Sequence, residues 1–275
     1  MQFADIKNDI AFRKIFGNEN KKEILISFLN AVLKLEGNKR IVWVEILNPY
    51  QLPIILGAKS TILDVKAKDK SGNEYIVEMQ VTEKIGFAKR IVYYTAKSYS
   101  AQLAVGDDYS KLKSTIFIGI LNFEFLETTN YISRHLILDA DTHEHKLKDL
   151  DFNFIELPKF NKTLEESQTL VEKWVYFIKN AENLSVIPEG LNDEGLLSAY
   201  TEANQHTWTK EDMEAYQYAR MRETDEVTRE MFILQKQSIE IAKSLLQTSL
   251  TDEEIAKHTG LTLEQIQDLK IKLNK

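Results

Sequence analysis

The segment from Thr61 to Val81 constrains the fold of this chain more than any other. It predicts two β-strands joined by a polar turn, Lys70-Ser71-Gly72-Asn73, because β-branched and other apolar residues alternate on both sides of that turn. Each predicted strand carries an acidic residue, Asp64 in the first and Glu78 in the second. Buried or half-buried strands rarely carry acids for packing reasons. We therefore interpret the two carboxylates as a sign of function.

Length and composition indicate a soluble globular protein. The chain has 275 residues, of which 43% are hydrophobic and 28% charged. No apolar run approaches the roughly 20 residues that a membrane span needs, and the acidic N-terminus differs from a signal peptide. We therefore expect a cytoplasmic protein without a membrane partner. The chain has no cysteine, which excludes disulfides, thiolate nucleophiles and Cys-type zinc sites.

Charge is distributed unevenly along the chain. Residues 1–115 carry 18 Lys and Arg against 13 Asp and Glu, whereas residues 116–275 carry 17 against 29. The basic front is compatible with a polyanionic partner, and the acidic remainder argues against a DNA-gripping tail. On charge alone, a solvated helical surface explains the same split equally well.

The pattern of apolar residues predicts the order α-β-β-β-α-β in the first half of the chain. A helix is expected over residues 21–35, strands over 40–47 and in the two halves of 61–81, a helix over 85–105 and a strand over 113–121. Further strands over 131–138 and 152–157 extend the sheet, with a polar turn over 139–145 between them.

The chain beyond Pro158 is rich in helix-forming residues. Helices are expected over 164–181 and within 193–246, where Thr209 and the acids after it predict a restart. Two short helices around Gly260 resemble a helix-turn-helix. The second of them carries Glu264 and Asp268, which would repel phosphates, so we favour a packing or oligomerisation role for this tail.

Alternation along the strands places Asp64 on the face of Lys66, and Glu78 on the face of Gln80. If the strands pair as a hairpin, the two carboxylates meet on one face. Two such oxygen ligands suit Mg²⁺ or Mn²⁺, with the carbonyl of Met79 as a third. An ion held there would polarise a phosphodiester and lower the pKa of a bound water. The alternative is a surface ion pair between these acids and nearby cations.

The spacing of these acids resembles the PD-(D/E)XK nuclease superfamily. Asp64 is followed by thirteen residues and then by Glu78-Met79-Gln80. More narrowly, the chain resembles the recombination-promoting nuclease and transposase family, in which glutamine commonly replaces the motif lysine. The resemblance runs from about Asn8 to Leu126 and includes Asp9, Phe12, Lys14 to Gly17, Ser27 to Asn30, Leu63 to Val65, Arg90, Tyr93, Tyr94, Gln102, Gly106 and Tyr109.

The resemblance implies an α/β protein of the PD-(D/E)XK, restriction-endonuclease-like fold, with an αβββαβ core, a mixed central sheet and a helical C-terminal region. Residues 1–160 would form the nuclease-like domain, 161–247 a helical accessory region and 248–275 the helix-turn-helix-like tail. The implied activity is Mg²⁺-dependent DNA cleavage of low sequence specificity, linked to recombination, mobile elements or defence. A homodimer through the C-terminal helices would bring two sites to one duplex.

The resemblance also assigns roles to individual residues. Asp64, Glu78 and the carbonyl of Met79 would bind the metal, and Gln80 would orient the water or the scissile phosphate. Because glutamine carries no charge, Lys66 is a candidate to replace the motif lysine.

Three further residues, Arg90, Gln102 and Asp9, are expected to line the DNA cleft, although a helix cap is an alternative for Asp9. Tyr93 and Tyr94 are as compatible with core packing as with DNA contact. The competing function is that of a catalytically inactive, transposon-derived protein that binds DNA or another protein.

Overall fold

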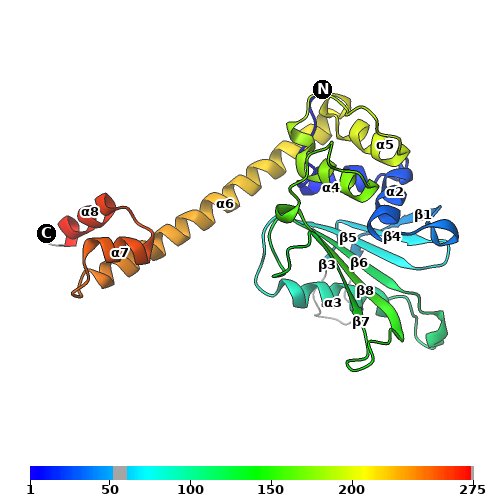
Figure 1. Ribbon diagram of the computed structural model, residues 1–275, viewed down its shortest axis with the longest axis horizontal. Helices are drawn as coiled ribbons and strands as arrows, with labels where there is room; N and C mark the ends of the chain where they lie inside the picture. Colours follow the sequence, from blue (N-terminus) through cyan, green and yellow to red (C-terminus); the bar gives the residue numbers. More distant parts are fainter. Residues whose placement is uncertain (52–60, 274–275) are drawn as a thin grey trace. The chain divides into compact units, whose positions relative to one another are not determined.

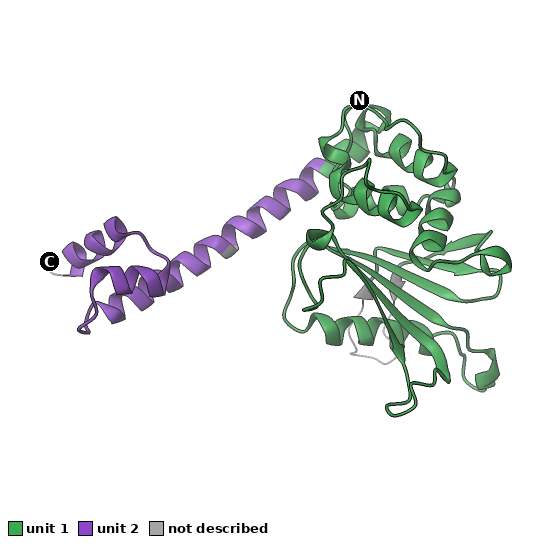
Figure 2. Ribbon diagram, in the orientation of Figure 1, with its two compact units in different colours: residues 1–216 green, residues 217–275 purple. Residues whose placement is uncertain are grey.

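The computed structural model describes residues 1–51 and 61–273 of the chain (Figure 1). These residues divide into two compact units, residues 1–216 and residues 217–275 (Figure 2). No helix within the described residues is both long and apolar enough to cross a bilayer.

Six of the described strands form one mixed sheet in unit 1. Their order across the sheet is β1 (Val44–Leu47), β4 (Val65–Asp69), β5 (Glu74–Gln80), β6 (Thr115–Leu121), β8 (Leu147–Glu156) and β7 (Ile132–Ile137). The central strands β5, β6 and β8 run parallel, while β1, β4 and β7 pair antiparallel with their neighbours. Separately, β2 (Tyr50–Gln51) pairs with β3 (Thr61–Ile62).

Helices precede the sheet and connect its strands in the expected order. The helices α1 (Asp9–Phe16) and α2 (Lys22–Val32) come before β1, and α3 (Phe87–Ser100) joins β5 to β6. Short 3₁₀ helices cover Gly37–Lys39, Tyr109–Lys111, Leu157–Lys159, Ala181–Asn183 and Gln205–Thr207. The αβββαβ core with a mixed sheet is therefore confirmed, as is the α/β fold class.

Alternate residues of β5 face two separate apolar cores. Tyr75, Val77 and Met79 belong to a large core shared with α1, α2, α4 (Leu170–Asn180) and α5 (Glu194–Ala203). Ile76 faces the opposite side, where Phe87 and Ile91 of α3 complete a smaller core. Figure 1 shows α3 on one side of the sheet and the other helices of unit 1 on the opposite side. Glu78 and Gln80, which alternate with the first set, lie on the α3 side.

The boundary between the two compact units lies after residue 216, whereas the sequence predicts boundaries after residues 160 and 247. Trp174 and Phe177 of α4 and Tyr200 of α5 are fully buried in the same core as Phe28 of α2. The indole of Trp174 donates to Ser27 Oγ, 3.1 Å away, which ties α4 to α2. Because this core is continuous, α4 and α5 belong to unit 1.

Several elements are shorter, longer or more divided than the sequence predicts. The predicted strand over 40–47 begins only at Val44, and the first half of the 61–81 hairpin is interrupted between Ile62 and Val65. The predicted helix over 164–181 begins at Leu170, because Thr169 and Glu172 form a capping box there. The strand predicted over 152–157 instead covers Leu147–Glu156.

The long helix α6 (Lys210–Leu245) begins at the predicted restart. Thr209 Oγ1 accepts from the backbone N–H of Asp212 at 3.1 Å, and Asp212 accepts in turn from the N–H of Thr209. Unit 2 contains the rest of α6 with α7 (Asp252–Thr259) and α8 (Leu263–Leu273). The two predicted short helices are thus present, and Gly260 between them has a φ of 70°.

Candidate active site

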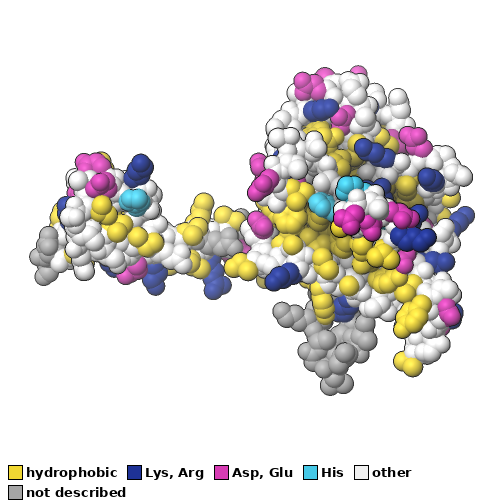
Figure 3. Space-filling model, turned by 60° about the horizontal axis from the view of Figure 1, so that its bottom comes forward, with side chains coloured by type: hydrophobic (Ala, Val, Ile, Leu, Met, Phe, Trp, Pro, Cys, Tyr) yellow, Lys and Arg dark blue, Asp and Glu magenta, His cyan; other side chains and the backbone are white. Residues whose placement is uncertain are grey.

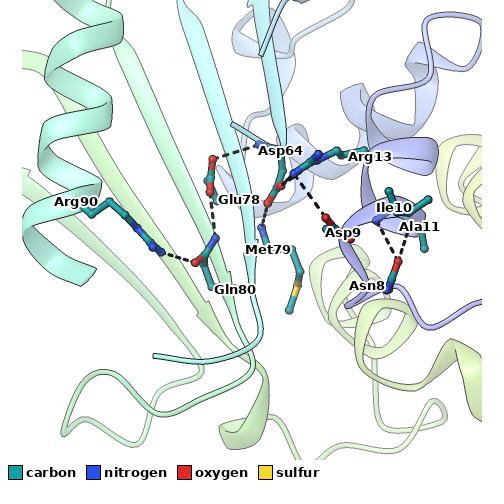
Figure 4. Close-up of polar contacts among 10 residues, drawn as sticks. All are labelled: Asn8, Asp9, Ile10, Ala11, Arg13, Asp64, Glu78, Met79, Gln80 and Arg90. Atoms are coloured by element: carbon teal, nitrogen blue, oxygen red, sulfur yellow. Dashed lines mark hydrogen bonds and ion pairs between the residues drawn. The ribbon is translucent and has the colours of Figure 1, made fainter. Parts of the chain in front are cut away.

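Asp64 lies in the interruption between β3 and β4, and it is bound to β5 at two points. Its backbone N–H donates to Glu78 Oε1 at 3.2 Å, and its Oδ2 accepts from the backbone N–H of Met79 at 2.9 Å (Figure 4). The register explains the meeting, because Val65 pairs with Val77 and the next antiparallel step brings Asp64 to Glu78. The structure therefore brings the two predicted carboxylates together.

Both carboxylates are almost completely buried, with exposed fractions of 5% for Glu78 and 8% for the Asp64 side chain. Burial raises the pKa of Glu78 to about 8, and the negative charge of Asp64 adds to the rise. Burial also raises the pKa of Asp64, although hydrogen bonds from Met79 and Arg13 oppose the rise. A cation bound here would offset the cost of ionising two neighbouring buried acids, so the position is electrostatically favourable for a cation.

Arg13, in the last turn of α1, supplies a cation that the sequence analysis did not single out. Its Nε and Nη2 both donate to Asp64 Oδ1, at 3.1 and 2.9 Å. The periodicity of α1 buries Ala11, Phe12, Ile15 and Phe16, which leaves Arg13 free to point away from the core. The helical periodicity therefore identifies Arg13 as a side chain outside the core. It does not identify Asp64, 51 residues away, as its partner.

Gln80 and Arg90 extend the polar contacts from Glu78 toward α3. Gln80 donates from Nε2 to Glu78 Oε2 at 3.1 Å, and its Oε1 accepts from Arg90 Nη2 (Figure 4). The Arg90 guanidinium also lies over the rings of Phe87 and Tyr94, at 5.5 and 6.0 Å from their centroids. A neutral amide thus stands between the buried acid and a cation.

The other predicted cleft residues have different surroundings. Lys66 lies on the α3 side of the sheet, but its Nζ is 3.0 Å from Glu74 Oε2. Gln102 donates to the carbonyl of Lys113 and to Thr115 Oγ1, at the start of β6. Since β5 and β6 run parallel, Gln102 lies at the opposite end of the strands from Gln80, roughly 20 Å along the sheet.

Asp9 is the first residue of α1 and not its cap, so the alternative role expected for it is wrong. The cap is Asn8, whose Oδ1 accepts from the backbone N–H groups of Ile10 and Ala11 (Figure 4). Asp9 instead lies one turn before Arg13, with 3.9 Å between Asp9 Oδ2 and Arg13 Nη2.

The two tyrosines of α3 differ in exposure. Tyr93 is 44% exposed, whereas Tyr94 is half-buried against the smaller core. Core packing explains the position of Tyr94. Of the two rings, that of Tyr93 is the one exposed enough for a contact with DNA.

The donor set fits a hard divalent cation. Among the described residues no group of three or more His, Asp or Glu side chains comes together as a metal site, so side chains supply two carboxylates. Mg²⁺ ordinarily binds through one or two carboxylates and completes its shell with water and substrate phosphate. The two buried acids would supply the negative charge that such an ion needs, and the backbone of Met79 adjoins Asp64.

Comparison with known proteins identifies a family that covers most of the chain. No curated protein and no solved structure matches the chain. A family model described as PD-(D/E)XK nuclease family transposase matches residues 6–231. That range includes the whole mixed sheet, both carboxylates, Gln80 and Arg90. The chain therefore belongs to the PD-(D/E)XK nuclease family transposases.

Proposed function

We propose that this protein is a metal-dependent DNA endonuclease that hydrolyses phosphodiester bonds with low sequence specificity. Membership of the family supports a nuclease- or transposase-like function. The observation that carries the finer proposal is the position of two buried acids side by side, where the backbone N–H of Asp64 donates to Glu78. The occasions we propose for cleavage are recombination, movement of mobile elements or defence, in the cytoplasm.

In this proposal Asp64, Glu78 and the carbonyl of Met79 bind Mg²⁺ or Mn²⁺. When bound, such an ion polarises a phosphodiester and lowers the pKa of a water. The protein's own contribution is to hold two oxygen ligands in one place before the ion arrives. Hydrogen bonds from the backbone N–H groups of Asp64 and Met79 fix both carboxylates against β5.

Gln80 is the residue that we assign to orienting the attacking water or the scissile phosphate. Its amide is held at both ends, by Glu78 and by Arg90, so its rotamer is fixed before substrate binds. Lys66 is paired with Glu74, and we therefore assign the cation of the cleft to Arg90. A positive charge beside the amide would stabilise the charge that develops on the phosphate.

A plasmid assay tests the proposal. Wild-type protein is incubated with supercoiled plasmid in Mg²⁺ or Mn²⁺, beside Asp64→Asn and Glu78→Gln, which keep side-chain size but remove the charge. Glu45→Gln is the matched control, because Glu45 is an exposed acid of the same sheet that pairs with Lys68 at 3.2 Å. We expect nicking by the wild type and by Glu45→Gln alone.

The same assay separates the endonuclease from a catalytically inactive DNA-binding or protein-interaction protein. Equal preservation of the plasmid by the wild type and both site variants, at saturating metal, would reject the enzyme. A gel-shift measurement on the intact protein would then distinguish DNA binding from protein interaction.

We also propose that the protein forms a homodimer through α6. The part of α6 in unit 2 exposes several large apolar side chains, which Figure 3 shows as yellow atoms along this helix. They are Met221, Val227, Met231, Phe232, Ile233 and Leu234. Exposed apolar side chains gathered on one helix are typical of an interaction surface, and a second copy would direct two sites to one duplex.

A further inference from the structure

Arg13 makes two contacts with one oxygen of the candidate metal site. Both Nε and Nη2 donate to Asp64 Oδ1, while Asp64 Oδ2 accepts from the Met79 backbone (Figure 4). Charge-assisted contacts of this kind are among the strongest hydrogen bonds in proteins. The guanidinium therefore occupies the coordination positions of Oδ1, the carboxylate oxygen that has no other partner in the site.

The pair is unequal in burial. The side chain of Asp64 is 8% exposed, but that of Arg13 is 39% exposed. Removing a buried acid's partner without replacing its charge is costly, whereas a half-exposed cation can return to water at little cost. Moving the Arg13 side chain into water thus costs little free energy, provided that another cation takes its place beside Asp64.

A second acid offers Arg13 an alternative partner. Asp9 lies one turn earlier on α1, with its Oδ2 3.9 Å from Arg13 Nη2, and its side chain is 48% exposed. Nη2 therefore lies between two acids, 2.9 Å from Asp64 and 3.9 Å from Asp9. Asp9 is on the same helix as Arg13 and already within ion-pair distance, so an exchange of partner needs no movement of another element.

We propose that Arg13 is an exchangeable counterion, which holds Asp64 until a divalent cation binds and then transfers to Asp9. This inference rests on the proposed function for the location of the metal. Arg13 is a positioning residue here, because it acts through Asp64. Its competition with the metal sets the concentration of cation at which the site fills.

Direct measurement of Mn²⁺ binding by the full-length protein, without DNA, tests this role. Free Mn²⁺ is followed by electron paramagnetic resonance in the wild type, Arg13→Gln and Asp64→Asn. We expect Arg13→Gln to bind Mn²⁺ about tenfold more tightly than the wild type, because its competitor is gone, and Asp64→Asn to lose the site. A purely structural Arg13 would have the opposite effect, since a loosened site binds more weakly.

Lys14→Gln is the matched control for a general change of charge. Lys14 is the next residue on α1, but its Nζ pairs with Asp212 at 2.7 Å. We expect this variant to bind Mn²⁺ as the wild type does. If Lys14→Gln tightened Mn²⁺ binding as much as Arg13→Gln does, the effect would come from the overall positive charge of α1, and the inference would be overturned.

The role of Asp9 is tested by a double-mutant cycle. Asp9→Asn should weaken Mn²⁺ binding in the wild-type background, because Arg13 then has no second partner, and should have no effect in Arg13→Gln. The same weakening in both backgrounds would mean that Asp9 acts on the metal directly, which contradicts the transfer.

The outcomes separate this inference from the proposed function. Wild-type binding of Mn²⁺ that Arg13→Gln does not tighten overturns the counterion role alone. Absence of Mn²⁺ binding from the wild type and from Arg13→Gln overturns both the counterion role and the metal dependence of the proposed enzyme.

Discussion

Gln80 donates a hydrogen bond from its Nε2 to Oε2 of Glu78, 3.1 Å away, at the position where the proposed site has no motif lysine. The orientation of the amide is fixed, because its Oε1 accepts from Arg90. A lysine at this position would place its own charge against Glu78. Glutamine instead connects Glu78 to a guanidinium on a different element, α3.

Replacing Gln80 should reduce catalysis without unfolding the protein. We expect Gln80→Met to slow single-turnover cleavage by about 100-fold, in the range typical of lost proton-transfer or positioning groups, with an unchanged melting temperature. Quenched-flow or gel-based single-turnover kinetics with a supercoiled plasmid measure this. Gln102→Met provides the comparison, since Gln102, in the turn after α3, hydrogen-bonds the start of β6 and its loss should lower the melting temperature with little change in rate. A slower reaction in Gln102→Met, with a normal rate in Gln80→Met, would indicate that Gln102 and not Gln80 belongs to the active site.

Glu172 predicts a pH dependence of stability. Burial alone would raise the pKa of this carboxyl, but hydrogen bonds from Lys162 and from Thr169 outweigh burial and lower the pKa to about 2. The stabilisation is therefore fully present above pH 4.5, the ordinary pKa of glutamate, and is lost as the pH falls toward 2. We expect Glu172→Gln to cost about 1 to 2 kcal/mol in the free energy of unfolding at pH 7.

Denaturant unfolding between pH 3 and pH 7 checks this expectation. The gap in unfolding free energy between the wild type and Glu172→Gln should narrow as the pH falls. A gap that stays constant with pH would show that the shape of the side chain, and not its charge, forms the cap at Thr169.

Gly195 is required where α5 crosses α2. A Cβ at this position would lie 2.4 Å from the carbonyl oxygen of Glu23 and 2.4 Å from Ser27 Cβ. Alanine favours a helix by up to about 1 kcal/mol over glycine, but overpacking against a rigid backbone costs about 1 to 3 kcal/mol. Gly195→Ala should therefore lower the melting temperature, measured by circular dichroism. Thr201→Ala on the exposed face of α5 is the control and should be close to neutral.

The fold was largely predictable because its signals are local. The turn at Gly72, the alternation along β5 and the capping residues at Thr209 each depend on neighbours within a few residues. The meeting of Asp64 with Glu78 also follows from the sequence, since a tight turn fixes the register of the two strands.

Other features depend on contacts between distant segments. Arg13 and Asp64 are 51 residues apart, and nothing in the α1 pattern indicates which acid its exposed cation meets. The same limit applies to α4 and α5. Their amphipathic patterns predict a buried face, but a pattern cannot identify α2 as the surface that buries it.

The apolar side chains of α6 give the last prediction. Phe232 is 65% exposed, and Met231 and Leu234 are exposed to a similar degree. Pairing of two copies of α6 through the face that carries Phe232 would bury this side chain, which contributes roughly 1.5 to 3 kcal/mol when fully removed from water. Phe232→Glu should therefore convert a dimer to a monomer in sedimentation-velocity experiments, because it would place a negative charge from each copy in the proposed contact.

The activity of the same variant shows what the dimer does. If two sites act on one duplex, Phe232→Glu should still nick supercoiled plasmid but should produce little linear product. Gln237→Glu adds the same charge at an exposed position about 140° around the same helix from Phe232 and serves as the control, which should remain dimeric. A monomeric wild type, or equal dissociation of both variants, would exclude α6 as the dimer contact, and linear product from a monomer would assign double-strand cleavage to successive nicks.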